Sequence, residues 1–303
     1  MSEYHIPVLL TESISALVTN PHGTYADATF GGGGHTALLL SRLSDGGHVI
    51  AFDRDIDAIA RAPKDPRLTL IHNNFRFIEN YARHEGVQFD GILADLGVSS
   101  HQFDTAERGF SFRFEDAPLD MRMNQEARLT AEEVVNTYPE ADLERILRLY
   151  GEVDGARNMA RLIADARSKE AIRTTGDLDR AIARMLPKGA EHKVLAKVYQ
   201  ALRIEVNQEM RSLEKFLEGA ARSLKPGGRL VVITYHSLED RMVKNFIKAG
   251  NVDGLEQKDV FGHTDTPLEA VNRKPILPEE SEIAGNTRAR SAKLRIAERR
   301  AEK

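Results

Sequence analysis

The chain contains no cysteine among its 303 residues. This absence excludes disulfide bonds, zinc sites with thiolate ligands and iron–sulfur clusters held by cysteine. It also excludes reactions that begin with attack by a cysteine thiolate. We therefore expect any chemistry to depend on other side chains, and we predict no metal site.

Long apolar stretches are also missing. No run approaches the ~18 residues that a membrane-spanning helix needs. Residues 1–10 carry no cationic region ahead of an apolar one, so we expect no secretory signal and a cytoplasmic location. With 41% hydrophobic and 29% charged residues, the composition is that of a globular protein with one large or two ordinary domains.

The net charge of −4 argues against a protein that coats nucleic acid without specificity. Local charge is different. Residues 157–203 hold eleven basic and five acidic residues, a net charge of +6, and residues 286–303 have a net charge of +5. Such clusters can form a footprint for phosphate groups, but each can equally be a set of solvated helix faces.

The segment 24–37 is the strongest local signal. An apolar run ends in an acid, Asp27, four glycines follow at 31–34, and a helical pattern begins. A second apolar run then ends in Asp53. A nucleotide-cofactor site has this order of parts, because glycines let backbone approach a ligand closely and the second acid can bond ribose hydroxyls. Taken alone, the glycine run is equally a flexible turn between a strand and a helix.

The pattern of elements predicts an α/β fold. Apolar runs alternate with helical patterns, which gives strands at 24–28, 48–53, 68–72 and 89–96, and helices at 34–43, 55–61 and 76–85. This alternation is typical of a doubly wound, Rossmann-like parallel sheet. Residues 129–199 instead predict several helices and no strand.

The last third of the chain returns to the sheet pattern. A long amphipathic helix is predicted from Gln200 to about Leu224, followed by a strand at 229–235, a helix at 238–248, and weaker strands at 255–261 and 292–297. The simplest organisation is a sheet domain of residues 1–103 and 198–303. An inserted all-helical domain of residues 104–197 would interrupt it and recognise the substrate.

Three hypotheses for function follow from these features. Gly32, Gly34 and Ala37 fit the spacing of a dinucleotide fingerprint, which suggests a nicotinamide-dependent dehydrogenase. However, Asp95 closes the fourth strand, where dehydrogenases are usually apolar, and a Pro-Gly-Gly turn at 226–228 precedes the fifth. Both features are typical of S-adenosylmethionine-dependent methyltransferases. A noncatalytic nucleic-acid-binding or ribosome-assembly protein with this fold is the third hypothesis.

Within the methyltransferase class, the missing cysteine excludes methylation of pyrimidine carbon 5 through a thiolate adduct. Radical methylation at a cysteine-bound cluster is excluded for the same reason. Direct transfer to a nitrogen, an oxygen or a similar nucleophile remains.

An ordered series of motifs spans nearly the whole chain. The motifs are HIPVLLTE, GGGGH, DLGVSSHQ, ERGFSFR, PLDMRM, QALRIEVN, PGGRLVVITYHSLEDR and NTRARSAKLRIAER. Together they resemble the bacterial small-subunit ribosomal RNA cytosine-N4 methyltransferases of the MraW type. The resemblance implies S-adenosyl-L-methionine as cofactor, with S-adenosyl-L-homocysteine as product. It implies a cytidine in the decoding region of 16S rRNA as target, within the small subunit or its precursor. No protein partner is implied by the resemblance, and we expect no membrane association because long apolar runs are missing.

The resemblance also assigns site residues. The cofactor contacts of the family correspond here to Gly33, Gly34, His35, Asp53, Phe75, Asp95 and Gln102. Asp53 would accept the ribose hydroxyls and Phe75 would face adenine, although Phe75 is almost as well explained as a core aromatic. Asp95 and Gln102 would lie where the methyl donor meets the substrate.

Two side chains are candidates for catalysis. Asp95 would accept hydrogens of the cytosine amine, or would serve the cofactor only, since the Pro-Pro-aromatic motif of many amino-methyltransferases does not follow it. His236, after the fifth strand, would contact the base or take a proton, or would simply cap a helix.

Cations interleaved with aromatics follow the fourth strand. The predicted RNA contacts are Arg108, Phe110, Phe112, Arg113, Arg288 and Arg290. Aromatic rings can stack on an extruded base and arginines can hold phosphates, but segment 108–114 can equally be a packed hinge. Many relatives carry a His-Pro-Ala-Thr-Arg type of segment where this chain has residues 191–197. The resemblance therefore says least about how the inserted domain binds its substrate.

Overall fold

The computed structural model describes residues 7–257 and 266–301. The chain divides into two compact units. The sheet unit comprises residues 1–97 and 210–303, and the helical unit comprises residues 98–209. The helical unit begins six residues before the expected insertion of 104–197 and ends twelve residues after it.

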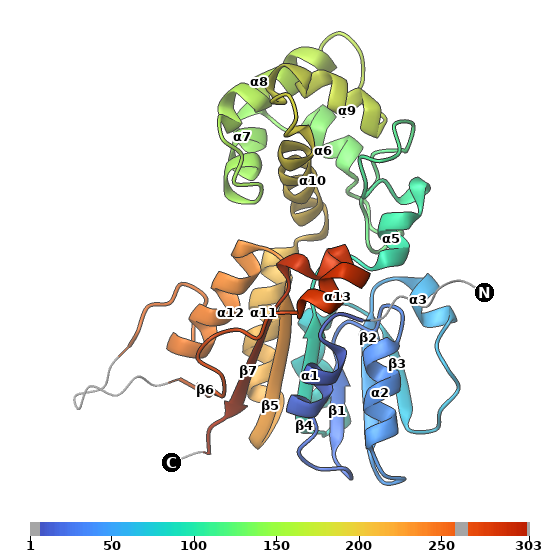
Figure 1. The fold of residues 1–303 in the computed structure, drawn as a ribbon, viewed down its shortest axis with the longest axis vertical. Coiled ribbons are helices and arrows are strands. Elements are labelled where there is room, and N and C mark those ends of the chain that lie inside the picture. The colour runs from blue at the N-terminus through green and yellow to red at the C-terminus, as the bar shows by residue number, and fades with distance from the viewer. Residues whose placement is uncertain (1–6, 258–265, 302–303) are drawn as a thin grey trace. The chain divides into compact units, whose positions relative to one another are not determined.

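The sheet unit is built on seven strands in the order β3-β2-β1-β4-β5-β7-β6 (Figure 1). The strands β3, β2, β1, β4 and β5 are mutually parallel, and β7 runs antiparallel to both β5 and β6. Their bounds are β1 Thr24–Asp27, β2 His48–Asp53, β3 Leu68–His72, β4 Phe89–Asp95, β5 Leu224–Thr234, β6 Leu268–Ala270 and β7 Lys293–Arg299.

Helices cover both faces of this sheet because each face carries its own apolar core. One core joins the strands to α1 and α2, and the other joins them to α4, α11 and α12. The helical elements of this unit are α1 Leu10–Leu17, α2 Gly34–Arg42, α3 Ile56–Ala60, η1 Phe75–Phe77, α4 Ile78–Glu85, α11 Glu209–Ser223, α12 Ser237–Ala249, α13 Glu280–Gly285 and η4 Thr287–Ser291.

The helical unit has a single apolar core of its own. Its elements are α5 Ser100–Asp104, η2 Ala106–Arg108, α6 Ala131–Thr137, α7 Glu140–Leu149, α8 Ala156–Arg167, α9 Thr175–Ile182, η3 Ala183–Met185 and α10 Glu191–Asn207. Residues 98–209 are all described and contain no strand, only an isolated bridge between Pro118 and Thr174. None of the helices among the described residues is long and apolar enough to cross a membrane.

The predicted doubly wound sheet is confirmed, and the first four strands lie where the sequence placed them. The strand predicted at 229–235 begins earlier, at Leu224, because the Pro-Gly-Gly segment forms an irregularity within β5. The strand predicted at 255–261 is wrong for residues 255–257, and its remaining residues lie outside the described part of the chain. The short strand β6 was not predicted.

The long helix expected from Gln200 to Leu224 is two helices, α10 and α11. The backbone of Gln208 is left-handed, with φ 50°, and this conformation ends α10. The guanidinium of Arg203 donates to both carboxylate oxygens of Glu209, at 2.8 Å each, across this break. Neither glycine nor proline marks the position, so the apolar periodicity alone could not reveal it.

Candidate active site

Three acids end neighbouring strands of the sheet unit. Asp27 ends β1, Asp53 ends β2 and Asp95 ends β4. From β1 the chain proceeds outward to β2, whereas from β4 it proceeds to β5 on the other side, so β1 and β4 flank the switch point of the topology. Ligands of doubly wound sheets bind at the carboxyl ends of the strands at this point.

The glycine segment forms the loop between β1 and α2. Gly31 and Gly33 have φ values of 53° and 76°, which residues with side chains rarely adopt. Gly34 opens α2, and a Cβ there would lie 2.2 Å from Cγ of Pro7. A Cβ on Gly32 would meet no protein atom within 4 Å. The loop therefore needs glycine for its own folding at 31, 33 and 34, and it presents open space at Gly32.

Asp53 is fixed against this loop by backbone donors. Its Oδ2 accepts from the N–H of Gly31 at 2.7 Å, and its Oδ1 accepts from the N–H of Asp55 at 2.8 Å. Burial raises the pKa of Asp53, and these N–H groups oppose the rise. Each carboxylate oxygen can accept a further hydrogen bond, as recognition of two ribose hydroxyls requires.

Asp95 is held by side chains from two other elements. The hydroxyl of Tyr235 donates to its Oδ1 at 2.7 Å, and Nδ1 of His35 lies 3.8 Å from its Oδ2. Nε2 of His35 is 3.2 Å from the carbonyl oxygen of Val8, so this nitrogen carries a proton and donates it. Burial raises the pKa of Asp95 to about 6, although His35 and the Tyr235 hydroxyl oppose the rise. The Asp95 side chain is still 24% exposed, so a ligand can reach it.

Phe75 follows β3 and is partly buried. Its ring makes an edge-to-face contact with Phe216 of α11, with centroids 5.2 Å apart. The ring therefore contributes to the core on one side, as the alternative interpretation held. Its partial burial leaves ring surface that can meet a ligand.

Gln102 belongs to the helical unit. It is the third residue of α5 and completes a capping box with Ser99, whose N–H donates to Oε1 of Gln102 at 3.2 Å. Its side chain is buried. The structure thus gives Gln102 a local structural role, and its expected cofactor contact stays a prediction.

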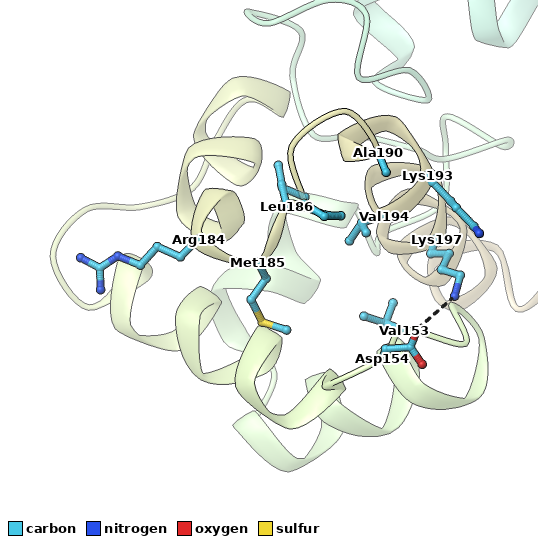
Figure 2. A pocket seen from close by; sticks show the side chains of 10 residues that line it. Val153, Asp154, Arg184, Met185, Leu186, Ala190, Lys193, Val194 and Lys197 are labelled. Carbon is cyan, nitrogen blue, oxygen red and sulfur yellow. Dashed lines mark ion pairs between the residues drawn. The ribbon is translucent and has the colours of Figure 1, made fainter.

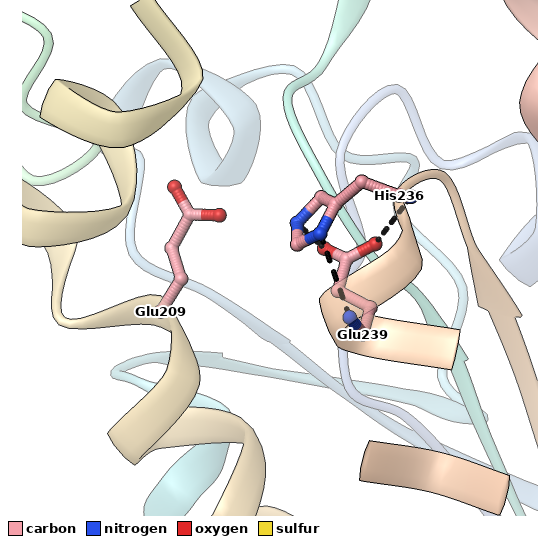
Figure 3. A group of neighbouring side chains, drawn as sticks. All are labelled: Glu209, His236 and Glu239. Carbon is pink, nitrogen blue, oxygen red and sulfur yellow. Dashed lines mark hydrogen bonds and ion pairs between the residues drawn. The ribbon is translucent and has the colours of Figure 1, made fainter. Parts of the chain in front are cut away.

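His236 is the N-cap of α12 (Figure 3). Its Nδ1 accepts from the N–H of Glu239 at 3.4 Å, and its Nε2 lies 3.1 Å from Oε1 of Glu239. Glu239 is buried. Because both ring nitrogens face Glu239, the geometry favours the helix-cap interpretation over proton transfer by His236.

Nearly the whole chain is similar to a known protein family. The model of the MraW methylase family matches residues 2–300. The chain belongs to this family. Its fold is accordingly a Rossmann-like class I methyltransferase sheet with an inserted helical unit.

Curated relatives in the family are similar over almost their full length. Proteins of Bacteroides thetaiotaomicron and Bacteroides fragilis named Ribosomal RNA small subunit methyltransferase H are each 55% identical over 298 residues. A protein of the same name from Flavobacterium johnsoniae is 53% identical over 298 residues. Each alignment covers 98% of this chain and 98% of the relative.

Two of the residues expected to contact RNA are buried. Arg108 is 5% exposed, and its guanidinium donates to the carbonyl oxygens of Arg122 and Met123 at 3.0 and 3.1 Å. Phe110 is 4% exposed within the helical core. Burial favours the packed-hinge interpretation for both residues, and their contact with RNA stays a prediction.

The other four expected RNA contacts are more accessible. The Arg113 side chain is 56% exposed and pairs with Asp104 at 2.9 Å. Phe112 is partly buried and stacks on His192, with centroids 5.4 Å apart. In η4, Arg288 is partly buried and Arg290 is exposed. Their contact with RNA stays a prediction.

The helical unit also contains a pocket of about 580 Å³ (Figure 2). It includes three residues of the segment that departs from many relatives, Lys193, Val194 and Lys197. Lys197 is paired with Asp154 at 3.9 Å, and Arg184 extends away from the apolar side chains of the pocket. The cations therefore do not converge on a common point, and we assign the pocket no role.

The sequence predictions missed two residues of the site. Asp27, which was noticed only as the end of an apolar run, is buried and accepts a hydrogen bond from Thr36 at 2.6 Å. Tyr235 binds a residue 140 positions away in the sequence. The spacing between strand end and glycines could have identified Asp27, but no local pattern indicates the partner of Tyr235.

Proposed function

We propose that the protein is an S-adenosylmethionine-dependent methyltransferase that methylates N4 of a cytidine in the decoding region of 16S ribosomal RNA. The observation that carries this proposal is the position of Asp95. It is an accessible carboxylate at the end of β4, beside the switch point and next to the glycine loop. The family, and the printed names of relatives at 55% identity, support the RNA substrate.

The residues at the carboxyl ends of the parallel strands are suited to bind S-adenosylmethionine. The open space at Gly32 allows close approach to the loop backbone, and Asp53 retains acceptor capacity for two hydroxyls. Phe75 offers an apolar ring surface for adenine. When bound, S-adenosylmethionine supplies an electrophilic methyl group on a sulfonium sulfur.

Asp95 addresses the weakness of the nucleophile. The lone pair of the cytosine amine is delocalised into the ring, so the amine attacks poorly in solution. A carboxylate that accepts an N4 hydrogen favours a pyramidal nitrogen whose lone pair can point at the methyl carbon, and it stabilises the positive charge that develops there. Asp95 would hold N4 for transfer of that methyl group and would receive the proton that the amine releases, before passing it to solvent.

The proposal is tested by identifying the methylated nucleoside. The protein is incubated with donor labelled in the methyl group and with naked 16S rRNA, isolated small subunits or DNA, and the product is digested to nucleosides. We expect N4-methylated cytidine from RNA or small subunits only. Label in another nucleoside, or in DNA, would overturn the substrate assignment. Binding of nicotinamide dinucleotide instead of S-adenosylmethionine in a thermal-shift comparison would overturn the reaction class.

A further inference from the structure

Tyr235 connects the end of β5 to the end of β4. It is the residue after Thr234, the last residue of β5, and its hydroxyl donates to Oδ1 of Asp95 at 2.7 Å. Burial and the neighbouring Asp95 raise the pKa of Tyr235 well above its ordinary value. The hydroxyl therefore keeps its proton at neutral pH and acts as a permanent donor to the carboxylate.

The tyrosine is itself held at two points. Its ring lies over Gly97, where an added Cβ would be 3.4 Å from Cδ2 of the tyrosine, and Gly97 has a φ of 103°. Its backbone N–H donates to Oε2 of the buried Glu239 at 2.8 Å. The ring and hydroxyl thus contact the turn after β4 while α12 fixes the tyrosine backbone.

This arrangement makes the two oxygens of Asp95 unequal. Oδ1 is engaged by Tyr235, whereas Oδ2 has the imidazole of His35 at 3.8 Å, a distance too long for a hydrogen bond. A carboxylate oriented through one oxygen presents the other in a fixed direction, which is what an acceptor for a substrate amine requires.

We infer that Tyr235 is a positioning residue that orients Asp95 and keeps it available as an ionised acceptor for the amine during methyl transfer. The inference depends on the proposed function, because it takes Asp95 as the group that meets the amine. Tyr235 acts through Asp95 and is assigned no contact with substrate or cofactor.

The charge state of Asp95 provides the readout. The groups that act on it electrostatically are His35 from α2, Asp27 from β1, Glu239 from α12 and Tyr235, and its pKa is about 6. Protonation removes the negative charge that makes the free Oδ2 a strong acceptor for the amine hydrogen, so activity falls as pH decreases through this pKa. A hydrogen bond to the charged form lowers a carboxyl pKa, so loss of the Tyr235 hydroxyl raises it.

The test compares Tyr235→Phe with the wild-type protein. The variant keeps the ring over Gly97 and removes only the hydroxyl. We expect the acid limb of the rate profile to move up by about one pH unit. At the wild-type midpoint, protonation of Asp95 alone then lowers kcat about fivefold, and this part of the loss disappears at pH values two or more units higher. A carbon-13 titration of the Asp95 carboxyl should show the same displacement without any turnover.

Tyr25→Phe is the matched control. Tyr25 is buried in β1 of the same unit, and its hydroxyl donates to the carbonyl oxygen of Asn20 at 2.9 Å. Tyr25→Phe removes this bond and the two that the hydroxyl accepts from the N–H groups of Thr19 and Asn20, at 3.2 and 3.0 Å, and the acid limb of this variant should not move. Glu239→Gln tests the opposite sign, because the negative charge of Glu239 raises the pKa of Asp95 and its removal should move the acid limb down.

The outcomes separate the inference from the proposed function. An acid limb that does not move in Tyr235→Phe, or an equal displacement in Tyr25→Phe, would overturn the positioning role. A displaced carboxyl titration with an unchanged acid limb would also overturn it, because Asp95 would then not limit the reaction. Absence of N4-methylated cytidine with the wild-type protein would instead overturn the proposed function, while the titration would still report the contact.

Discussion

The hydroxyl of Thr36 donates a 2.6 Å hydrogen bond to Oδ2 of the buried Asp27. Asp27 ends β1 and Thr36 lies in the first turn of α2, so the bond joins the two ends of the glycine loop. Oδ1 of Asp27 accepts from the N–H of Thr29 at 3.1 Å, which fixes the start of the same loop. The loop is thereby held in place by the protein itself, before any cofactor binds.

We expect three of the four loop glycines, at 32, 33 and 34, to differ in their tolerance of alanine. Gly33→Ala should lower the free energy of unfolding by about 1–3 kcal/mol, because its φ is 76° and the new Cβ would lie 2.8 Å from the Phe30 ring. Gly34→Ala should also be destabilised by contact with Pro7. Gly32→Ala should stay within about 0.5 kcal/mol of the wild type, because its Cβ meets no protein atom. Urea unfolding measures all three, and equal losses at 32 and 33 would contradict the loop geometry.

Asp53→Ala should weaken binding of S-adenosylmethionine. Loss of charge-assisted bonds to the ribose hydroxyls costs about 1.5–3 kcal/mol for each bond, which raises Kd at least about tenfold. Isothermal titration calorimetry measures the effect. Asp45→Ala is the control. It removes an equal charge just before the first residue of β2, at the end of the strand opposite to Asp53. An unchanged Kd in Asp53→Ala would contradict the assignment of Asp53 to the ribose hydroxyls.

Asp95→Asn should stabilise the protein without cofactor at neutral pH. The folded pKa of Asp95, about 6, lies above its ordinary value of 3.8, so the folded state binds the proton more tightly than the unfolded state. The wild-type protein therefore loses stability as pH rises from 3.8 to 6, by up to about 3 kcal/mol. Asparagine avoids this loss. The difference in unfolding free energy should be largest above pH 6 and vanish below pH 4, and a constant difference across this range would contradict the raised pKa.

Arg113→Ala should weaken RNA binding without changing stability. Its side chain is 56% exposed, and each lost phosphate contact reduces the salt slope of binding by about 1. Arg108→Ala should instead lower the free energy of unfolding by at least about 2 kcal/mol, because two buried carbonyl groups lose a charged donor. Arg83→Ala, at an exposed arginine paired with Glu79 in the sheet unit, serves as control for both. An effect of Arg113→Ala on unfolding and none on RNA affinity would reverse the assignments.

The sheet was predictable because its signals are local. Each strand from β1 to β4 is a short apolar run closed by a polar residue. The position of Asp53 and Asp95 at strand ends can therefore be predicted from the local sequence alone. The break at Gln208 and the burial of Arg108 were not predictable in this way. Both depend on partners, Glu209 for Arg203 and the carbonyl groups of Arg122 and Met123 for Arg108, that only the folded unit supplies.

The same limit applies to the chemistry of the site. His236 lies at the end of a strand as catalytic histidines do, yet its ring caps α12 through Glu239. Tyr235, its neighbour, lies in a quoted motif but was given no role, and it contacts Asp95 across 140 positions. The sequence left both roles open for His236, and the direction of its side chain favours the cap.

The central claim is that Asp95 accepts a hydrogen bond from the cytosine amine that receives the methyl group. The most direct test is a single-turnover transfer of labelled methyl from the preformed cofactor complex to small ribosomal subunits, with wild-type protein and Asp95→Asn measured side by side. We predict N4-methylated cytidine from the wild type, and from the variant equal cofactor binding with a rate lower by at least about a hundredfold. A variant that binds cofactor and transfers methyl at the wild-type rate would contradict the claim.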